Sequence, residues 1–354
     1  METTRPNKTA QLNKRDLFLA NARGEFTART PIWIMRQAGR YLPDYRRVRE
    51  RYSFEELAKT PAAVAEVSAQ PVEILGLDAV IIFSDILFIL EPLGIDLTFD
   101  PGPKLSPFLE TPEQAAGYRL YDTGDKLGFV GEALVETRQR IGPDVAMLGF
   151  CGAPFTVFCY LCGLRGAKDF HKAIQFLIRH PEAGKDVLDL LSEVSIDYLK
   201  MQIAAGADAV QIFDTWAGDL SEKEYCWWAY PYVEKVVQAL KADGATVSLY
   251  TKGSYHLLDR IARLDVDIVN LDWKTPLPYA AKKLTPKTLQ GNLNPHQLLG
   301  SPDQVAAAAL EVLDSAGSYP GFIFNLGHGI LPQTPVENVR TLVETVHAYE
   351  RRAP

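Results

Sequence analysis

The chain has 354 residues, of which 47% are hydrophobic and 23% are charged, and its formal net charge is -7. This composition supplies apolar material for a large core and excludes disordered and fibrous proteins. The negative charge argues against a nucleic-acid partner or a membrane-surface partner, because both attract proteins with a basic face.

The N-terminal extension, residues 1–29, is expected to hold one short helix and lacks the continuous apolar run of a signal peptide. No later segment reaches the roughly 20 apolar residues of a membrane span. The four cysteines are too few for a disulfide framework in a chain of this length, which favours a reducing compartment. We therefore expect a cytoplasmic protein without a membrane segment.

Eight short runs rich in β-branched and aromatic residues recur along the chain. They cover residues 31–35, 79–84, 145–150, 209–214, 246–250, 267–272, 288–293 and 322–327. Most are continuously apolar, as are the strands of a parallel sheet with both faces buried. Segments with helical periodicity lie between them, at 54–75, 126–141, 181–206, 222–244 and 302–317.

This alternation of strand and helix predicts a parallel sheet with right-handed crossovers. Eight repeats fit a closed barrel, whereas a doubly wound sheet more often has about five or six strands and a glycine-rich phosphate turn after the first. No G-x-G-x-x-G sequence follows residues 31–35. We therefore predict the α/β class and a single-domain (β/α)8 TIM barrel that spans residues 1–354.

A proline-rich segment, residues 91–112, follows the second predicted strand and lacks helical periodicity. Two interpretations are open for it. It is either an ordered insertion, which in a barrel would lie over the catalytic mouth, or a plain surface loop.

Polar residues follow the predicted strands, where barrel enzymes carry their catalytic groups. In chain order these positions are Arg36, Arg40, Asp85, residues 152–160, Asp214, Thr215, Lys252, Asp272, Asn292, Asn294 and His328.

The densest of these features is the arginine-rich sequence RQAGRYLPDYRRVRER at residues 36–51. Guanidinium groups bind carboxylates through two hydrogen bonds and stay charged, so a cluster of them suits a substrate with several carboxylates or phosphates. Arg36 and Arg40 leave a buried strand through a turn that contains glycine, which favours a binding role. A solvated helix face is expected for Arg46, Arg47 and Arg51, with Arg49 left open.

Four other strand-end residues are candidates with alternatives. Burial would raise the pKa of Asp85, so we expect a catalytic or ligand-binding carboxyl, the alternative being a helix cap. His328 lies between glycines and either approaches a ligand or is structural. Lys252 could form a Schiff base, although an ion pair is favoured. For Asp214 and Asp272 we expect roles in the scaffold.

The pair Cys159 and Cys162 has the spacing of metal ligands, but neither a second pair nor an H-x-C sequence accompanies it. Its neighbours are apolar. We therefore expect no metal site.

These motifs together resemble the uroporphyrinogen decarboxylase family. PIWIMRQAGRYLPDYR at 31–46 is similar to the family's N-terminal signature, and GFCGAPFTVFCYLCGLRG at 149–166 is similar to its second signature. IIFSDIL, QIFDTWAG and NLGHGI follow in the expected order, so the resemblance covers essentially the whole chain. It implies a cofactor-free barrel, usually a homodimer, that converts the four acetate side chains of uroporphyrinogen III into methyl groups. The products would be coproporphyrinogen III and CO2, in haem and tetrapyrrole synthesis.

The resemblance also implies roles for individual residues. Substrate carboxylates would contact Arg36, Gln37, Ala38, Gly39, Arg40 and His328. Tyr160 and Thr215 would donate hydrogen bonds to the substrate, and Asp85 would accept the pyrrole N–H groups. Thr215 departs from the family, which more often has serine there, but the hydroxyl is retained.

The implied chemistry needs an electron sink, and the sequence carries no signature of thiamine, pyridoxal or a metal. A pyrrole ring that gains a proton on carbon becomes a cation, which can accept the electrons left by CO2. Asp85 would stabilise that cation in the transition state, with Arg36 as the second catalytic residue. The proton donor stays open among Arg36, Tyr160, His328 and a water molecule.

Two alternatives from other functional classes remain. A corrinoid-linked methyltransferase would share the barrel but needs a zinc ion held by histidine and cysteine. A non-enzymatic tetrapyrrole carrier would need the arginines but not a buried carboxyl.

Overall fold

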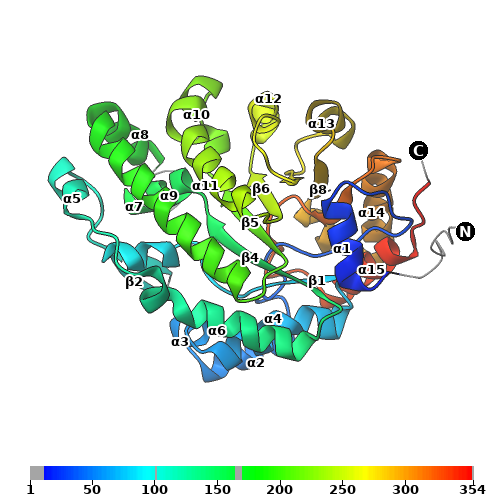
Figure 1. Cartoon of the computed structure of the whole chain (residues 1–354). Helices are drawn as coiled ribbons and strands as arrows, with labels where there is room; N and C mark the ends of the chain where they lie inside the picture. The colour runs from blue at the N-terminus through cyan, green and yellow to red at the C-terminus, as the bar shows by residue number, and fades with distance from the viewer. Residues whose placement is uncertain (1–11, 100–101, 164–169, 353–354) are drawn as a thin grey trace, which may run out of the picture.

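The computed structural model describes residues 12–99, 102–163 and 170–352. Within these ranges its main element is a curled, seven-stranded parallel sheet in the order β1-β4-β5-β6-β7-β8-β9, wrapped by helices (Figure 1). The strands are β1 (Ala79–Ile81), β4 (Ala146–Gly152), β5 (Ala209–Asp214), β6 (Val247–Thr251), β7 (Ile268–Asn270), β8 (Thr288–Leu293) and β9 (Phe322–Leu326). The predicted parallel barrel of the α/β class is confirmed.

The segment 31–35 takes the place of the predicted first strand, but it is not a regular strand. Its one ladder contact in the described chain is an isolated parallel bridge from Ile32 to Phe324. The Phe324 N–H donates to the Pro31 carbonyl at 2.8 Å, and the Asp78 N–H donates to the Ile32 carbonyl at 2.9 Å. The segment therefore lies between β9 and β1 and closes the barrel.

Side chains explain why this segment forms no continuous ladder, because they accept most of its backbone N–H groups. The pairs are Ile32 N–H to Asp78 Oδ2, Ile34 N–H to Gln37 Oε1 and Met35 N–H to Asn325 Oδ1, at 2.9, 3.0 and 2.9 Å. The prediction of a regular strand over 31–35 was therefore wrong in its pairing, although right in its place.

The outer helices follow the predicted periodicity, with two breaks. They are α1 (Lys14–Ala22), α2 (Pro43–Arg51), α3 (Phe54–Ala58), α4 (Pro61–Leu75), α5 (Pro112–Gly117), α6 (Thr123–Ile141), α7 (Pro154–Leu161), α8 (Phe170–Arg179), α9 (Pro181–Ala204), α10 (Glu222–Trp228), α11 (Tyr230–Ala242), α12 (Leu258–Ile261), α13 (Leu277–Leu284), α14 (Pro302–Ala316) and α15 (Val336–Ala348). The predicted helices 54–75 and 222–244 are each split at a proline, Pro61 and Pro231. Proline favours the first turn of a helix and disfavours helical backbone before it.

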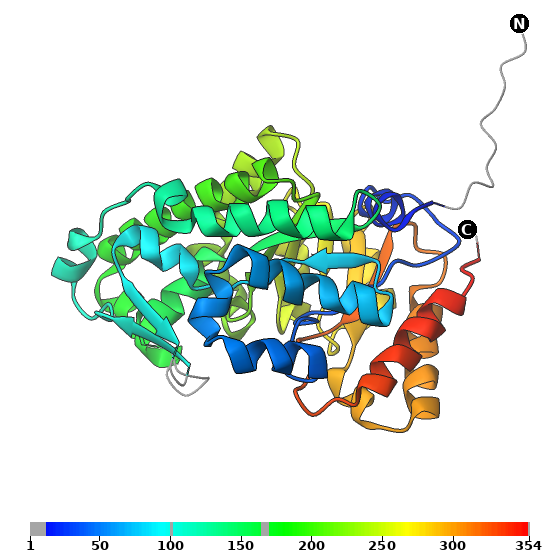
Figure 2. The same cartoon turned by 90° about the horizontal axis from the view of Figure 1, so that it is seen from below.

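The described part of the insertion after β1 contains two paired strands that the sequence did not predict. A 3-10 turn (Phe88–Leu93) leads into β2 (Asp96–Phe99), which pairs antiparallel with β3 (Pro103–Ser106). Phe99 packs on Phe54 with ring centroids 4.7 Å apart, so the hairpin rests on α3. In Figure 2 it lies at the end of the molecule away from α14 and α15.

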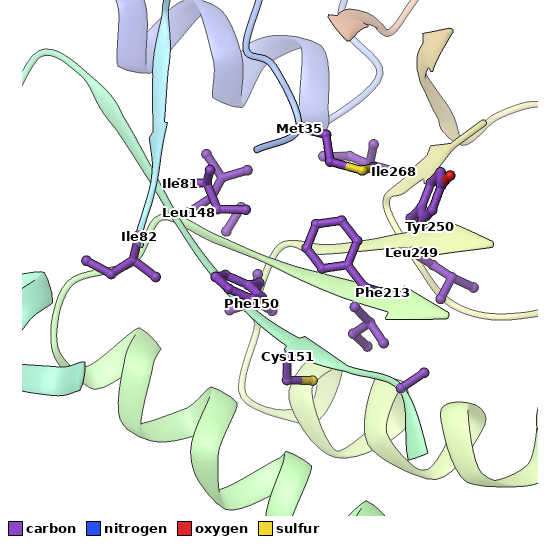
Figure 3. Close-up of a cluster of buried hydrophobic side chains, with 14 of the residues drawn as sticks. Met35, Ile81, Ile82, Leu148, Phe150, Cys151, Phe213, Leu249, Tyr250 and Ile268 are labelled. Carbon is purple, nitrogen blue, oxygen red and sulfur yellow. The ribbon is translucent and has the colours of Figure 1, made fainter. Parts of the chain in front are cut away.

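The core fills the interior of the barrel. Side chains from the closing segment and from several strands meet there, among them Met35, Phe150, Phe213 and Tyr250 (Figure 3). No helix of the described residues is long and apolar enough to cross a membrane.

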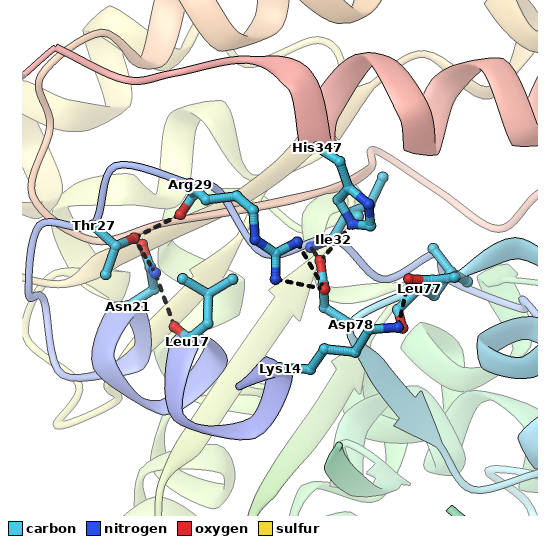
Figure 4. Close-up of polar contacts among 10 residues, drawn as sticks. Lys14, Leu17, Asn21, Thr27, Arg29, Ile32, Leu77, Asp78 and His347 are labelled. Atoms are coloured by element: carbon cyan, nitrogen blue, oxygen red, sulfur yellow. Dashed lines mark hydrogen bonds and ion pairs between the residues drawn. The ribbon is translucent and has the colours of Figure 1, made fainter. Parts of the chain in front are cut away.

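Three aspartates, each just before a strand, link neighbouring elements at the amino-terminal rim of the barrel by hydrogen bonds. Asp78, Asp208 and Asp267 each accept the N–H of a residue on the neighbouring element. The partners are Ile32, Met147 and Val247, at 2.9, 2.8 and 2.8 Å. Each carboxylate also binds a cation, as Figure 4 shows for Asp78 with Arg29 and His347. This rim therefore serves stability, and the opposite rim is free for chemistry.

Candidate functional site

The turn after the closing segment, on the opposite rim, holds a residue in a strained backbone conformation. Arg36 has a φ of 66°, and within the described chain it is the only residue other than glycine with a positive φ. The turn is closed by the Gln37 N–H, which donates to the Ile34 carbonyl at 2.9 Å. A left-handed conformation costs a non-glycine residue about 1–2 kcal/mol, and such strain concentrates at functional sites.

This turn directs the Arg36 side chain to the neighbouring loop, which follows β9. A β-carbon on Gly329 would lie 2.4 Å from the Arg36 Cδ and 2.9 Å from its Nε. The guanidinium therefore lies against the backbone next to His328, which is possible because residue 329 has no side chain.

Gln37, by contrast, is used by the scaffold. It is fully buried, its Nε2 donates to the Ala79 carbonyl at 3.0 Å, and its Oε1 accepts the Ile34 N–H at 3.0 Å. Both ends of its amide are engaged, so the side chain is not free for the substrate contact that the resemblance implied. The amide instead ties the closing segment to β1.

The rest of the arginine turn lies nearer the surface. Ala38 and Gly39 are half-buried, and a β-carbon on Gly39 would lie 2.8 Å from the Arg36 carbonyl oxygen. Arg40 is exposed, and its carbonyl accepts the Arg46 guanidinium at 2.7 Å. Neither Arg36 nor Arg40 has a carboxylate within 4.0 Å in the described ranges, so both charges are available to an anion.

Asp85 follows β1 and presents one free carboxylate oxygen. Its Oδ1 accepts the Leu87 N–H at 2.9 Å, as a cap would, whereas no described residue donates to its Oδ2. Burial raises the pKa of Asp85, while the Leu87 N–H and the nearby Arg36 charge lower it. One carboxylate oxygen therefore acts as the cap that was the alternative for Asp85, and the other oxygen has no described donor.

A buried hydroxyl joins the turn after β5 to helix α7. The Thr156 Oγ1 donates to the Asp214 Oδ1 at 2.8 Å and accepts the Trp216 N–H at 3.1 Å. This link brings half-buried Thr215 towards half-buried Tyr160. Burial raises the pKa of the Tyr160 phenol, and Asp85 raises it further while the Trp216 indole N–H and Arg36 lower it.

His328 is held as a neutral imidazole. Its Nδ1 accepts the Gly329 N–H at 2.7 Å, which assigns the ring proton to Nε2. Burial, with Arg36 and Lys252 nearby, lowers the pKa of His328 to about 4. The Tyr250 hydroxyl donates to the Gly327 carbonyl at 2.9 Å and so fixes the loop that carries this imidazole. His328 is therefore a hydrogen-bond donor at neutral pH, and not a charged acid.

Of the remaining candidates at the strand ends, three hold loops of the scaffold and one, Lys252, has no ion pair in the described chain. The Asp272 Oδ2 accepts the Gly253 N–H at 2.6 Å, and the Asn292 Nδ2 donates to the Asp272 carbonyl at 2.9 Å, so both hold loops. Asn294 accepts the His296 N–H at 3.1 Å and starts a short 3-10 helix. Lys252 has no carboxylate within 4.0 Å among the described residues, so the ion pair favoured from the sequence is absent there.

The inner wall of the mouth is aromatic. Phe150, Phe213, Tyr250 and His328 form a series of rings whose successive centroids are 5.6, 6.0 and 6.2 Å apart. Figure 3 shows the first three side chains converging from β4, β5 and β6. Phe150 and Phe213 keep 8% and 9% of their surface exposed, so they can be touched by a flat ligand.

A metal site is not formed by the residues that the structure describes. They contain no group of three or more histidine, cysteine or acidic side chains suited to a metal ion. Cys159 on α7 and Cys162 at the C-cap of that helix are buried, and burial raises the pKa of both thiols, which disfavours the thiolate that zinc requires.

Sequence reasoning missed three contributors to this site, namely Trp216, Tyr250 and Gly329. Trp216 directly follows Thr215, and Gly329 directly follows His328, so their proximity was a usable signal. Tyr250 ends a predicted strand, but nothing local indicates that its hydroxyl reaches the loop after β9.

The chain is similar over most of its length to a known family and to named proteins. Residues 13–349 match the family described as Uroporphyrinogen decarboxylase (URO-D). A protein named uroporphyrinogen decarboxylase from Geotalea uraniireducens is 41% identical over 335 residues, which cover 95% of this chain and 99% of that protein. Another with the same name, from Chlorobium phaeobacteroides, is 40% identical over 341 residues and covers 94% of this chain and 97% of its own.

Solved structures agree in fold. A methyltransferase from Methanosarcina mazei superposes with a TM-score of 0.81 at 22% identity and covers 95% of this chain and 98% of its own. A B12-independent methionine synthase from Shewanella sp. superposes with a TM-score of 0.58 at 12% identity, over 92% and 97% of the two chains. At these identities the likeness shows the fold alone.

Proposed function

The chain belongs to the uroporphyrinogen decarboxylase family, and we propose that it removes CO2 from all four acetate side chains of uroporphyrinogen III without a bound cofactor. Its activity is that of a carboxy-lyase of tetrapyrrole biosynthesis. We further propose that isomer III is the substrate, that four carboxylates are removed, and that the product is coproporphyrinogen III.

The observation that carries the proposal is the free Oδ2 of Asp85 at the mouth of the barrel. A porphyrinogen has four pyrrole N–H groups that point to its centre, and these need one acceptor. An oxygen that has no donor among the described residues, next to the exposed Arg36 guanidinium and an aromatic wall, provides that acceptor.

The edge of the macrocycle is bound by different groups. Uroporphyrinogen carries eight carboxylates, and the unpaired charges of Arg36 and Arg40 suit them. The His328 Nε2–H donates to a carboxylate without adding charge, because Nδ1 is already engaged. Tyr160 and Thr215 supply hydroxyl groups from α7 and from the turn after β5.

The chemical step uses the substrate as its own electron sink. A proton added to a pyrrole carbon gives a cation, and loss of CO2 from the neighbouring acetate returns two electrons to that ring. A second proton then converts the exocyclic carbon into a methyl group, while the ring carbon releases the first. Asp85 stabilises the cation, because that charge exists only along the reaction path.

The low pKa of His328, about 4, leaves little imidazolium at neutral pH, so His328 is a poor proton donor there. Tyr160 keeps its proton, because burial raises the pKa of its phenol. Arg36, Tyr160 and water therefore remain the donors to be separated. We also infer that the chain acts as one barrel domain and as a homodimer, as is usual in the family.

The test is anaerobic incubation of the purified protein with uroporphyrinogen III and excess chelator, followed by chromatography of the oxidised porphyrins. The expected products are coproporphyrin III and transient porphyrins with seven, six and five carboxylates. Binding without loss of CO2 would favour the tetrapyrrole carrier, and activity that disappears with the chelator would overturn the cofactor-free mechanism.

A further inference from the structure

Lys252 is a cation at the mouth of the barrel that has no ion pair in the described chain. It directly follows β6, is half-buried, and has no carboxylate within 4.0 Å among residues 12–99, 102–163 and 170–352. Two other partly buried lysines are paired, Lys241 with Asp267 at 2.7 Å and Lys283 with Asp259 at 2.8 Å. An unpaired, half-buried ammonium is unfavourable unless an anion binds it.

The backbone on both sides of Lys252 is fixed. A β-carbon on Gly218 would lie 1.7 Å from the Lys252 carbonyl oxygen, so the loop after β5 packs directly on this peptide. The next residue, Gly253, has a φ of 73° and donates its N–H to Asp272 at 2.6 Å. The stem of Lys252 is therefore positioned by two neighbouring loops.

The ammonium itself points towards the site. Its Nζ lies 5.6 Å from the centroid of the Trp216 ring, and Trp216 belongs to the turn that carries Thr215. Its charge also acts on His328, whose pKa it lowers together with Arg36. Lys252 and Arg36 thus act on one imidazole from two different elements.

The order of the sheet places these two cations opposite each other. From the closing segment 31–35, β6 is reached through β1, β4 and β5 in one direction and through β9, β8 and β7 in the other. Four steps separate them either way around the barrel. Arg36 and Lys252 therefore stand across the mouth from each other.

We propose that Lys252 binds a substrate carboxylate at the edge of the macrocycle opposite Arg36 and Arg40. This inference rests on the proposed function, since the macrocycle is what spans the mouth. A porphyrinogen carries carboxylates on every side, so a clamp on one edge leaves those on the far edge without partners. Lys252 supplies the missing charge.

The test compares Lys252→Gln with Lys252→Arg and with the control Lys223→Gln in anaerobic steady-state assays. Lys223 also lies over a tryptophan, 4.6 Å from the Trp227 ring, but it is exposed on α10. Lys252→Gln is expected to raise KM for uroporphyrinogen III roughly tenfold, as loss of one charge-assisted hydrogen bond does, with kcat within about a factor of two. Lys252→Arg should restore most of the affinity, and Lys223→Gln should leave KM unchanged.

Salt dependence gives a second measurement that a purely structural role would not change. In the parent protein KM should rise with NaCl, and the rise should be shallower in Lys252→Gln, because one screened interaction has been removed. A KM within twofold of the parent, or a lower kcat at unchanged KM, would overturn the proposal. Failure of the proposed function is a different result, because the parent protein itself would then form no coproporphyrin.

Discussion

The methylene chain of Arg36 lies across the backbone of Gly329, so closely that a β-carbon on residue 329 would sit 2.4 Å from the Arg36 Cδ. The position of the Arg36 side chain thus depends on a residue that is separated from it by most of the chain. The left-handed turn directs the arginine side chain to the neighbouring loop after β9, and the glycine leaves room for it.

Gly329→Ala should therefore displace Arg36 and leave the fold intact, because the arginine is flexible and the backbone is not. A displacement of about 1 Å in a binding group can lower kcat/KM roughly 100-fold. The check is kcat/KM for uroporphyrinogen together with the melting temperature. Gly128→Ala on α6 is the control, since a β-carbon there meets no atom within 4 Å. Equal kcat/KM in both variants would contradict the proposed role of Arg36.

Asp85→Asn should retain the fold and bind substrate but turn over slowly. The amide keeps the shape of the side chain and loses the charge that would stabilise the cationic intermediate. A fall in kcat of roughly 100- to 1000-fold is expected, the range found when one electrostatic stabiliser is removed. Single-turnover assays separate this effect from binding. Near-normal turnover would remove Asp85 from the mechanism.

The pH profile offers an independent check on the same group. Asp85 must be ionised to act, and burial raises its pKa above the ordinary value. Activity should therefore be full above the raised pKa and be lost as the pH falls through it. The acid limb of kcat/KM should lie above pH 4, about the ordinary aspartate pKa, and the residual activity of Asp85→Asn should lack that limb.

Asp78→Asn should destabilise the protein with little effect on turnover, because Asp78 lies at the opposite rim. Burial alone would raise the pKa of Asp78, but the hydrogen bond and charge of His347, with Arg29 and the Ile32 N–H, hold it below the ordinary value. Removing one member of a buried ion pair typically costs about 3–5 kcal/mol. Urea unfolding at neutral pH measures this loss.

The lowered pKa also fixes how that stability depends on pH. Asp78 stabilises the fold fully above its unfolded pKa, and this contribution disappears as the pH falls through the lower, folded value. The difference in free energy of unfolding between the parent and Asp78→Asn should therefore shrink in acid. A constant difference from pH 6 to pH 3 would show that the charge of Asp78 is not what stabilises this rim.

Asp214→Asn, unlike Asp78→Asn, should increase the stability of the fold at high pH. Asp214 is fully buried, its Oδ2 has no partner in the described chain, and burial raises its pKa to about 7. A raised pKa means that the fold loses stability as the pH rises from the unfolded value through the folded one. The loss is about 1.4 kcal/mol per pKa unit, so asparagine should stabilise the protein by a few kcal/mol at pH 8 and less at pH 6. Thermal melts of both proteins at the two pH values test this.

The class of the fold and the positions of most helices and strands follow from the amino-acid sequence alone. The runs 209–214 and 288–293 coincide with β5 and β8. The run 209–214 was recognisable because a short, largely apolar segment bounded by turns is a local property of the sequence. The order of strands and helices then placed Asp85, Lys252 and His328 at one rim, since parallel strands end on the same side. The sequence motifs are sufficient to indicate the family.

Which polar side chains form hydrogen bonds or ion pairs within the protein is seen only in the folded structure. Gln37 matches the motif but is used by the Ile34 N–H and the Ala79 carbonyl, whereas Lys252, expected in an ion pair, has none in the described chain. The physical reason is that a charge or an amide is satisfied by atoms from residues distant in sequence. The periodicity of the sequence predicts which face of an element a residue occupies. The contacts of its side chain on that face are seen only in the assembled barrel.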